Sequence, residues 1–373
     1  MADIRVKFVS QKISKVRFQP TQGVYSQGSD VFASGNWDDV AGRVCLWQIP
    51  PGGSDLGDMG GDDETAGDRE PIILCEVPHR GDVTDMQFMT SDAIAASSSF
   101  GSLTIYRHRN LQSLEDAMQW VGLHTGLGDV SCPCTCLATQ GDDLIVTGGE
   151  DGRVNVLNVA HRAPVRTLEK ANSCSINGIK FLKQLDILTI DSCGQLKIFD
   201  LRENTDEPSR TFSVSGEQVP LQCLARHPTQ QHIVATGGHD GVLSIWDLRQ
   251  ERFPVTLLEA HAAPMWEVLF HPASPDHLFT CSEDGSVWHW DSSAVTSLVT
   301  GTGAGSGGGS LFSQHPGAGT RASHNQPLAW AGDRQIQDGD QHPSAQPVAA
   351  NQHTRHTGGD ARVWVGRGSF VHG

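Results

Sequence analysis

Residues His232–Arg249, which read HIVATGGHDGVLSIWDLR, decide the fold. With a period of two, Ile233–Thr236 makes one short strand and Val242–Trp246 makes the next. Gly238–Gly241 lies between them, and Asp-Gly between apolar runs indicates a hairpin whose two central turn residues have positive φ. A single hairpin cannot bury its apolar face, so these strands need neighbours.

The same hairpin recurs along the chain. Five further copies span Val31–Ile49, Ala93–His108, Leu144–Val159, Asp186–Arg202 and His277–Asp291. The large residues that close the six hairpins are Trp47, Tyr106, Leu157, Phe199, Trp246 and Trp290, separated by 59, 51, 42, 47 and 44 residues. This period is typical of a WD40 β-propeller with four strands per blade. The sequence therefore predicts an all-β propeller with six recognisable blades.

A finer register accompanies the repeat and selects candidate site residues. Acids stand six residues before three of the closing residues, and threonines stand four residues earlier; the threonine spacing also holds before Phe199. The resulting positions are Thr147, Asp151, Thr189, Thr236, Asp240, Thr280 and Asp284, and two hairpins end in Trp246-Asp247 and Trp290-Asp291. The pattern resembles the WD-repeat family, in which Thr, Asp, His and Trp form a buried hydrogen-bonded set, and His261 is expected to complete one.

Two interpretations of this set are open. A catalytic Asp–His–Thr group is the sharper one. Repetition in several blades favours a structural role, because an active site is usually built once whereas a packing device recurs. No G-x-S-x-G, H-E-x-x-H or P-loop motif is present, so we expect no enzyme and no catalytic residues.

Composition bounds the partners. The chain has 373 residues with 27 Lys+Arg, 43 Asp+Glu and a net charge of −16, which argues against direct binding to nucleic acid. No apolar run reaches the length of a membrane span, and the first residues, MADIRVKFVS, lack the apolar core of a signal peptide. We expect an intracellular protein with no membrane insertion, no cofactor and no small-molecule ligand.

Two stretches raise the question of metal ions. Cys132, Cys134 and Cys136 alternate, which would place three thiols on one strand face. Zinc sites prefer wider spacing, so reduced thiols acting as small buried apolar groups are expected. Residues 51–70 are acidic and Gly-rich, which predicts a solvated, disordered insertion in blade one. Calcium binding is the alternative there, although the acids lack EF-hand spacing.

Both ends of the chain depart from the repeat. Ile4–Val9 is a candidate strand that would belong to the last blade and close the ring, while Ile13–Phe18 would begin blade one. Residues 1–293 are thus predicted as the propeller, and 294–373 as a Gly/Ser/His-rich low-complexity tail. Within the tail only Pro327–Trp330 and Arg362–Val365 could form strands, and its dispersed histidines suggest solvation rather than metal binding.

Several stretches carry a closer resemblance. KFVSQKISK at Lys7–Lys15, GQLKIFDLR at Gly194–Arg202, VATGGHDGVLSIWDLRQ at Val234–Gln250, MWEVLFHP at Met265–Pro272 and HLFTCSEDGSVWHWD at His277–Asp291 resemble the family of small WD-repeat nucleoporins of the Y-shaped nuclear pore scaffold. The resemblance covers about residues 1–293. It implies a seventh blade, which is expected to be poorly formed or missing here, so that Ile4–Val9 lacks its normal partners.

The resemblance implies a function. The chain is expected to be a non-catalytic scaffold subunit of the nuclear pore outer ring, bound to other nucleoporins, including a large α-helical one in the short arm of the Y. Roles in protein and mRNA transport, and at the kinetochore in mitosis, would follow. The alternative is a substrate receptor of a cullin-type ubiquitin ligase, because Trp246–Arg249 and Phe199–Arg202 look like the W-D-x-R pattern of such receptors.

Overall fold

The computed structural model describes residues 4–9, 11–20, 28–37, 41–50, 70–126, 128–214, 218–250, 252–292, 331–335 and 361–366. Residues 4–8, 331–335 and 361–366 are described by their backbone alone. The chain divides into two compact units, unit 1 (Met1–Ile179 and Arg355–Gly373) and unit 2 (Lys180–Thr354). None of the described segments forms a helix long and apolar enough to cross a membrane.

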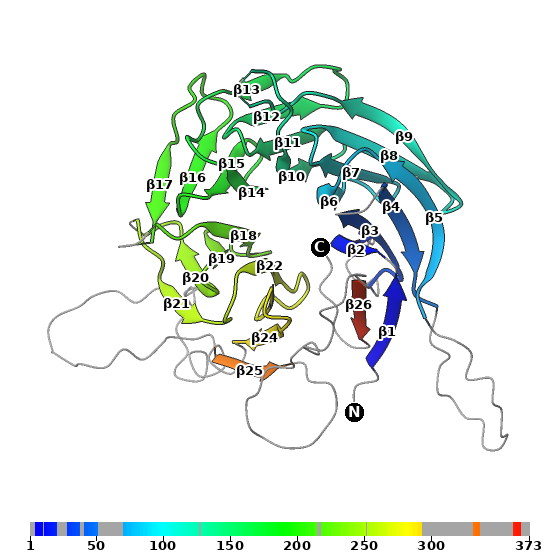
Figure 1. The fold of residues 1–373 in the computed structure, drawn as a ribbon. Coiled ribbons are helices and arrows are strands. Elements are labelled where there is room, and N and C mark those ends of the chain that lie inside the picture. The colour runs from blue at the N-terminus through cyan, green and yellow to red at the C-terminus, as the bar shows by residue number, and fades with distance from the viewer. Residues whose placement is uncertain are drawn as a thin grey trace, which may run out of the picture. The chain divides into compact units, whose positions relative to one another are not determined.

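The described strands form six antiparallel four-stranded sheets in chain order (Figure 1). Blade one contains β2 (Lys12–Phe18), β3 (Val31–Trp37), β4 (Gly42–Gln48) and β5 (Ile72–His79). Blade two contains β6 (Val83–Phe88), β7 (Ala93–Ser98), β8 (Leu103–Arg109) and β9 (Ser113–Trp120). Blade three contains β10 (Cys134–Gln140), β11 (Leu144–Gly149), β12 (Val154–Asn158) and β13 (Arg166–Leu168). Blade four contains β14 (Ile176–Phe181), β15 (Asp186–Asp191), β16 (Gln195–Asp200) and β17 (Arg210–Ser213). Blade five contains β18 (Leu221–Arg226), β19 (Ile233–Gly238), β20 (Val242–Asp247) and β21 (Thr256–Glu259). Blade six contains β22 (Met265–Phe270), β23 (His277–Ser282), β24 (Val287–Asp291) and β25 (Ala331–Gln335). The predicted fold class, an all-β WD40 β-propeller with six recognisable blades, is confirmed.

The β19–β20 hairpin differs in detail from the expected turn. Gly241 has a φ of +79°, whereas Asp240 is not among the residues with positive φ. The Gly241 N–H donates to Gly238 O at 3.2 Å, so a three-residue connection replaces a two-residue one. A glycine with positive φ after such a turn restores the strand register, which removes the need for positive φ at the aspartate.

The outer strand of blade two has little of the sequence pattern that is typical of a strand. Ser113–Trp120, which reads SLEDAMQW, forms β9 and pairs with β8 over its whole length. Its middle residues, Glu115–Ala117, are exposed. An edge strand that covers its neighbour with only a few side chains lacks the apolar alternation by which strands are recognised.

A bulge recurs in the first strand of five blades. The extra residue is Ser14 in β2, Thr84 in β6, Thr135 in β10, Gln222 in β18 and Trp266 in β22. In unit 1 the Thr84 hydroxyl donates to Cys134 O, and the Thr135 hydroxyl donates to Ile176 O and, at 3.0 Å, to Gly148 O. At Thr84 and Thr135 the bulge thus turns a hydroxyl toward the first strand of the following blade.

The bulge corrects the interpretation of the alternating cysteines. Cys132 precedes β10, and the bulge at Thr135 separates Cys134 from Cys136, so the three thiols do not share one strand face. Cys134 and Cys136 are buried, and burial raises the pKa of the Cys134 thiol well above its ordinary value. The Cys134 side chain is therefore a protonated thiol within blade three.

The core lies in apolar layers that each combine neighbouring sheets of one unit. In unit 2, Ile233, Ala235, Leu243 and Ile245 of blade five pack with Met265, Val268, Phe270, Leu278 and Trp290 of blade six. In unit 1, Ala33, Val44 and Leu46 of blade one pack with Val83, Met86, Ile94 and Tyr106 of blade two. Period-two strands supply one face to each layer, which explains why apolar residues alternate along every hairpin.

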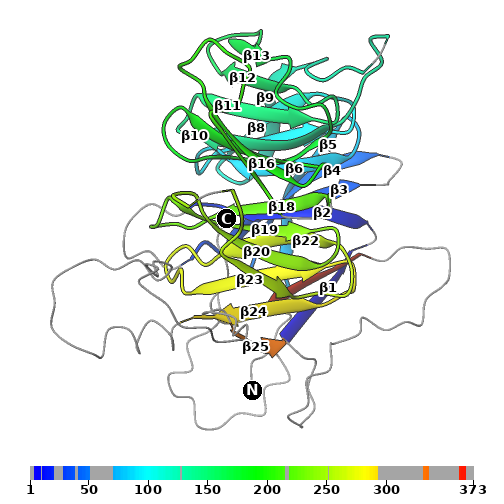
Figure 2. The ribbon, with the colours of Figure 1, turned by 90° about the vertical axis from the view of Figure 1, so that its left-hand side faces the viewer.

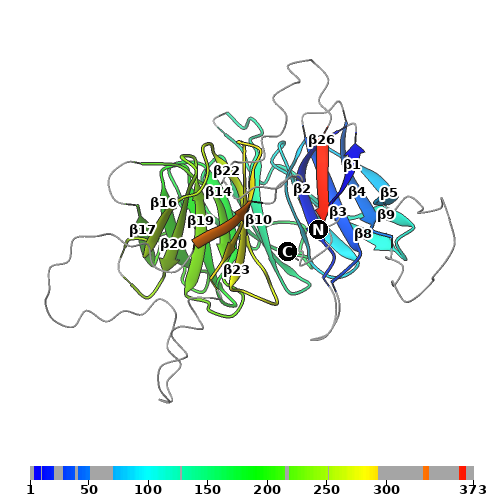
Figure 3. The same cartoon turned by 90° about the horizontal axis from the view of Figure 1, so that it is seen from below.

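Strands from the two ends of the chain pair with each other. β1 (Ile4–Val9) and β26 (Ala361–Gly366) form a separate two-stranded antiparallel sheet, visible in Figure 3, with Ile4 opposite Gly366 and Val9 opposite Ala361. The expected strand at Arg362–Val365 is confirmed. Ile4–Val9, which was expected to lack its normal partners, has β26 as a partner among the described strands and pairs with it over all six residues.

The end of blade six also comes from the C-terminal region. β25 pairs with β24 and completes the sheet, as Figure 2 shows. The candidate strand Pro327–Trp330, most of the acidic insertion 51–70 and most of the tail lie outside the described residues. The division into a propeller at 1–293 and a low-complexity tail at 294–373 stays a prediction.

Candidate functional site

Blade six contains a complete set of the predicted buried residues. Trp290 Nε1 donates to Thr280 Oγ1 at 3.0 Å, and the same hydroxyl lies 2.8 Å from His261 Nε2. His261 Nδ1 lies 3.2 Å from Asp284 Oδ2 and 2.9 Å from Ser286 Oγ. Burial lowers the pKa of His261, and Asp284 only partly offsets this. The contacts are all satisfied by a neutral ring with its proton on Nδ1.

Blade three carries the same set without the tryptophan. His124 is fully buried between β9 and β10, with Nδ1 2.9 Å from Asp151 Oδ1 and Nε2 3.0 Å from Thr147 Oγ1. Leu157 occupies the tryptophan position. Burial opposes ionisation of Asp151, but the hydrogen bond and charge of His124 and two backbone N–H donors outweigh it and lower its pKa. His124 did not emerge from the sequence, because its distance from the hairpin differs from that of His261.

Three other blades retain one contact of the set. Trp246 Nε1 donates to Thr236 Oγ1 at 2.8 Å in blade five, and Trp47 Nε1 donates to Ser34 Oγ at 2.7 Å in blade one. In blade two, Tyr106 and His79 are joined at 2.7 Å between the hydroxyl and Nδ1. Asp240 was expected in a buried set, but it is exposed and accepts the Val242 N–H at 3.1 Å, which caps the hairpin turn instead.

Blade four departs from the others. Phe199 stands at the tryptophan position, so the buried Thr189 hydroxyl receives no indole donor and has no hydrogen-bond partner among the residues that the structure describes. Asp191, two residues further, is buried and accepts the N–H groups of Cys193 at 3.0 Å and Gln195 at 2.8 Å. Burial raises the pKa of Asp191, although these bonds and the Lys197 ammonium, 3.5 Å away, work against the rise.

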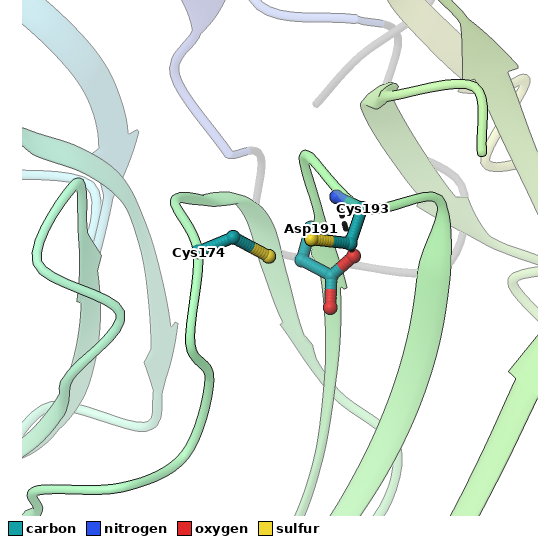
Figure 4. A group of neighbouring side chains, drawn as sticks. All are labelled: Cys174, Asp191 and Cys193. Carbon is teal, nitrogen blue, oxygen red and sulfur yellow. Dashed lines mark hydrogen bonds between the residues drawn. The ribbon is translucent and has the colours of Figure 1, made fainter.

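The sequence analysis missed Asp191, which lies outside the Thr–Asp spacing. Figure 4 shows Asp191 beside Cys193, and the dashed line marks the hydrogen bond that the Cys193 N–H donates to the Asp191 carboxylate. In unit 2, Asp191 and Cys193 offer two potential metal ligands, a carboxylate and a thiol, which is fewer than the four ligands of a structural zinc site. The ion pair with Lys197 and the two backbone donors favour Asp191 as an internally compensated buried acid.

Geometry weighs against catalysis by these sets. A Ser–His–Asp catalytic triad needs a nucleophilic hydroxyl that is accessible to substrate. Thr280 faces His261 Nε2, but it is 1% exposed and already accepts the Trp290 N–H, while Ser286 is buried and donates to Asp284 Oδ1 at 2.6 Å. We therefore propose that these residues tie the strands of each blade together.

The W-D-L-R sequence at Trp246–Arg249 and the F-D-L-R sequence at Phe199–Arg202 form internal ion pairs. Arg249 Nε and Nη2 contact the Asp247 carboxylate at 3.0 and 2.7 Å. Arg202 contacts Asp200 at 2.8 and 2.7 Å and also Asp186 at 3.0 Å. Burial opposes ionisation of Asp247, yet the hydrogen bonds from Arg249 outweigh it and lower the pKa of Asp247. These contacts explain both arginines without a ligase partner.

We expect R249A to destabilise the fold by about 1 kcal/mol, because it leaves the buried Asp247 carboxylate with fewer donors. R202A is the matched control, and its effect should be smaller because the Asp200 side chain is 20% exposed against 1% for Asp247. Chemical denaturation of the two variants measures the difference. Equal losses would contradict the importance of burial at Asp247.

Exposed aromatic and aliphatic side chains are the candidates for partner contacts. In the described part of unit 1, the side chains with at least two-fifths of their surface exposed are Trp37, Ile72, Ile73, Phe100, Val121, Val130 and Val165. In the described part of unit 2 they are Phe253, Leu257, Trp266 and Val287. Arg80 lies over the Phe100 ring at 5.6 Å, and Lys12 lies over Trp37 at 5.6 Å. Large aromatic side chains flanked by cations are typical anchors of protein interfaces.

Comparisons with known proteins place the chain among relatives. A model of the WD domain, G-beta repeat, matches residues 207–247 and 252–291. Nucleoporin Nup43 of Homo sapiens and that of Mus musculus are each 48% identical over 299 residues, which is 79% of this chain and 77% of the relative. A nuclear pore complex protein nup43 of Dictyostelium discoideum is 30% identical over 147 residues, or 39% of this chain and 34% of the relative.

Proposed function

Because the chain belongs to the nucleoporin Nup43 family, we propose that it is a non-catalytic structural subunit of the nuclear pore complex. The observation that carries this function is the 48% identity, which extends over 299 residues or 79% of this chain. A match of this length includes the parts of blades that the generic repeat leaves variable. The protein acts at the nuclear envelope, in the pore.

The finer assignment follows the family resemblance. We propose that the chain belongs to the Y-shaped scaffold of the outer ring and contacts other nucleoporins, among them a large α-helical one in the short arm. Through the assembled pore it supports transport of protein and mRNA, and in mitosis it acts at kinetochores. The net charge of −16 supports contact with proteins rather than with nucleic acid.

The described side chains support a binding role over catalysis. The histidine and threonine of the His–Thr–Asp sets in blades three and six are buried, and the hydrogen-bonding groups of these sets contact one another. Exposed aromatic residues occur instead at hairpin turns and strand bulges, such as Trp37, Phe100 and Trp266. This distribution suits a rigid scaffold that presents anchors to other proteins, and it requires no cofactor or small-molecule ligand.

Affinity purification tests the assignment. The tagged full-length chain is expressed in interphase cells, and recovered proteins are quantified by mass spectrometry. Near-stoichiometric recovery of the Y-shaped scaffold nucleoporins is expected. Recovery of a ubiquitin-ligase adaptor in their place would overturn the proposal and support the receptor alternative.

Surface variants then locate the contact. W37A/F100A removes two exposed anchors of unit 1, and W266A/F253A removes two of unit 2. Each pair leaves the buried core intact, so folding is expected to be retained, which circular dichroism checks. Loss of nucleoporin recovery in one pair, with recovery kept in the other, identifies the unit that docks. Unchanged recovery in both would exclude these aromatic residues as anchors.

A further inference from the structure

The hairpin turn of blade two carries a phenylalanine where most other blades carry an aspartate. In the described turns of blades two to six, this residue precedes a glycine with positive φ, and in chain order it is Phe100, Asp151, Cys193, Asp240 and Asp284. Each of the three aspartates accepts, with Oδ1, the N–H of the residue two positions later, at distances of 2.8–3.1 Å. The Phe100 side chain has no oxygen and cannot cap its turn in this way.

The exchange leaves a buried hydroxyl without a partner. In blade six, Ser286 Oγ donates to Asp284 Oδ1 at 2.6 Å. Ser102 holds the equivalent position two residues after Phe100, is 3% exposed, and its Oγ has no hydrogen-bond partner among the described residues. An unsatisfied buried polar group lowers stability. Blade two therefore departs from the local rule of the fold at a cost, which is typical of functional positions.

Hydrogen bonds hold the turn of Phe100 from two sides. Ser99 exchanges two of them with Asp82, since Ser99 N donates to Asp82 O at 3.0 Å and Asp82 N donates to Ser99 Oγ at 2.9 Å. Ser131, from the connection between β9 and β10, donates its hydroxyl to Phe100 O. Phe100 N in turn donates to Ser98 Oγ at 3.1 Å. The backbone beneath the ring is thereby fixed before a partner binds, which lowers the entropy cost of binding.

The Phe100 ring lies against a glycine and beside a cation, and half of the residue remains exposed. A Cβ on Gly81 would lie 2.5 Å from Phe100 Cδ2, so the ring packs directly on this part of the backbone. The Arg80 guanidinium lies 5.6 Å from the ring centroid, and Phe100 is 50% exposed. Val130, which is 65% exposed, precedes the Ser131 that bonds to Phe100 O. Unit 1 thus presents an aromatic ring, an aliphatic side chain and a cation around one turn.

Charge and spacing indicate the kind of partner that fits here. Arg80 is exposed and forms no ion pair with the residues that the structure describes. A partner carboxylate can therefore bind its guanidinium without breaking an existing ion pair. Side chains four residues apart on a helix have Cβ atoms about 5–6 Å apart, which matches the 5.6 Å between the Phe100 ring centroid and the guanidinium. A helix with an apolar residue and an acid at that spacing contacts both groups at once.

We propose that Phe100 and Arg80 bind an amphipathic α-helix of a partner protein, with an apolar side chain on the exposed part of the Phe100 ring and an Asp or Glu carboxylate on Arg80. This inference rests on the proposed function, because the helix would belong to the large α-helical nucleoporin of the scaffold. It deepens that function by assigning the contact to one turn of unit 1 and by stating the chemistry of the helix. The missing turn cap is then the stability cost of an exposed anchor.

Two replacements of Phe100 separate binding from folding. F100A and F100D both remove the ring, but only F100D restores a carboxylate that can cap the turn and accept the Ser102 hydroxyl, as Asp284 does for Ser286. We expect the Tm of F100D to lie about 1–3 °C above that of F100A. Both variants should nevertheless lower the recovery of the α-helical nucleoporin by about 10–30-fold, because each removes the central aromatic anchor.

Two further variants test the charge and the location. R80E reverses the cation and should lower recovery of the same nucleoporin by about 5-fold or more, since it places two like charges together. F253A is the matched control, because Phe253 lies in unit 2 and is 52% exposed against 50% for Phe100. It should leave recovery unchanged.

Photocrosslinking identifies the occupant. Phe100 is replaced by p-benzoylphenylalanine in the full-length chain, interphase cells are irradiated, and the crosslinked peptides are sequenced by mass spectrometry. We expect peptides from a helical segment of the α-helical nucleoporin in which an Asp or Glu stands three or four residues from an apolar residue. Crosslinks to a second copy of this chain, or to a segment without an acid, would overturn the proposal.

The outcomes distinguish this inference from the function on which it rests. A wild-type chain that recovers no scaffold nucleoporin would overturn both. Normal recovery by the wild type together with normal recovery by folded F100A and F100D would overturn this inference alone. Loss of recovery in F100D, despite its higher Tm than F100A, supports a binding role because a merely structural role predicts the opposite order.

Discussion

Replacement of Trp246 by alanine is expected to destabilise the protein by about 3–5 kcal/mol. Trp246 is fully buried on β20, and its ring packs edge-on against Phe212 with centroids 6.3 Å apart. Leu188, Leu196, Leu224 and Val234 belong to the same buried cluster. Removal of the indole therefore leaves a large cavity shared by blades four and five and also removes the hydrogen bond to Thr236.

W246F is the matched control for the cavity. It keeps most of the ring volume but removes the N–H that reaches Thr236 Oγ1, so a loss of about 1–2 kcal/mol is expected. Blade four provides the precedent, because Phe199 and Thr189 occupy the same two positions without a hydrogen bond between them. Urea denaturation of both variants gives the two free energies. Equal losses in W246A and W246F would mean that the hydrogen bond, not the packing, dominates.

Acidification is expected to weaken the fold between about pH 6.5 and pH 4. Burial lowers the pKa of His79 to about 4 and that of His227 to about 4. Between these values and the ordinary histidine pKa the unfolded chain binds more protons than the folded one, so stability falls as pH falls through this window. Each histidine contributes at most about 3 kcal/mol to this loss.

His227 allows the effect to be isolated. Its Nδ1 accepts the N–H groups of Gln230 at 3.0 Å and Thr229 at 3.3 Å, and protonation of Nδ1 would abolish this acceptor. H227N retains an acceptor oxygen but cannot be protonated in this range, so it should lose less stability than the wild type between pH 7 and pH 4.5. Denaturant midpoints at the two pH values provide the measurement.

An exposed histidine serves as the control for acid sensitivity. H239N lies outside the core and should retain the full acid-induced loss of the wild type. The pKa values of Asp151 and Asp284 are lowered, so their stabilising contributions disappear only below the ordinary aspartate pKa and do not enter this window. A wild-type protein equally stable at pH 7 and pH 4.5 would contradict the expectation.

The sequence predicted the blades because each hairpin carries its own signal. Alternating apolar residues, an acidic or Gly-rich turn and a closing aromatic lie within some fifteen residues of one another, as in Ile233–Trp246. The outermost strand Ser113–Trp120 has no such signal, because exposed residues dominate its middle. The pairing of β1 with β26 joins the two ends of the chain and depends on contacts that no local pattern encodes.

The candidate site was predictable only where it followed the repeat. Thr280, Asp284 and Trp290 stand at fixed spacings, and His261 was proposed as their fourth member, whereas His124 and Asp191 fall outside those spacings. The sequence also shows Phe100 at a turn that has lost its acid, but the exposed fraction of Phe100 and its distance from Arg80 depend on how the neighbouring connections pack. Neither quantity can be read from residue order.

The bulges in β6 and β10 have a consequence for synthesis on the ribosome. The Thr84 hydroxyl finds its acceptor, Cys134 O, 50 residues later in the chain, and Thr135 finds Ile176 O 41 residues later. Each of these two hydroxyls has a partner in its own blade, Ser97 Oγ for Thr84 and Gly148 O for Thr135. The contact with the next blade forms only after the first strand of that blade has been translated and has docked. In this region, we expect each blade of the nascent chain to complete its contacts only after about one further blade has been translated.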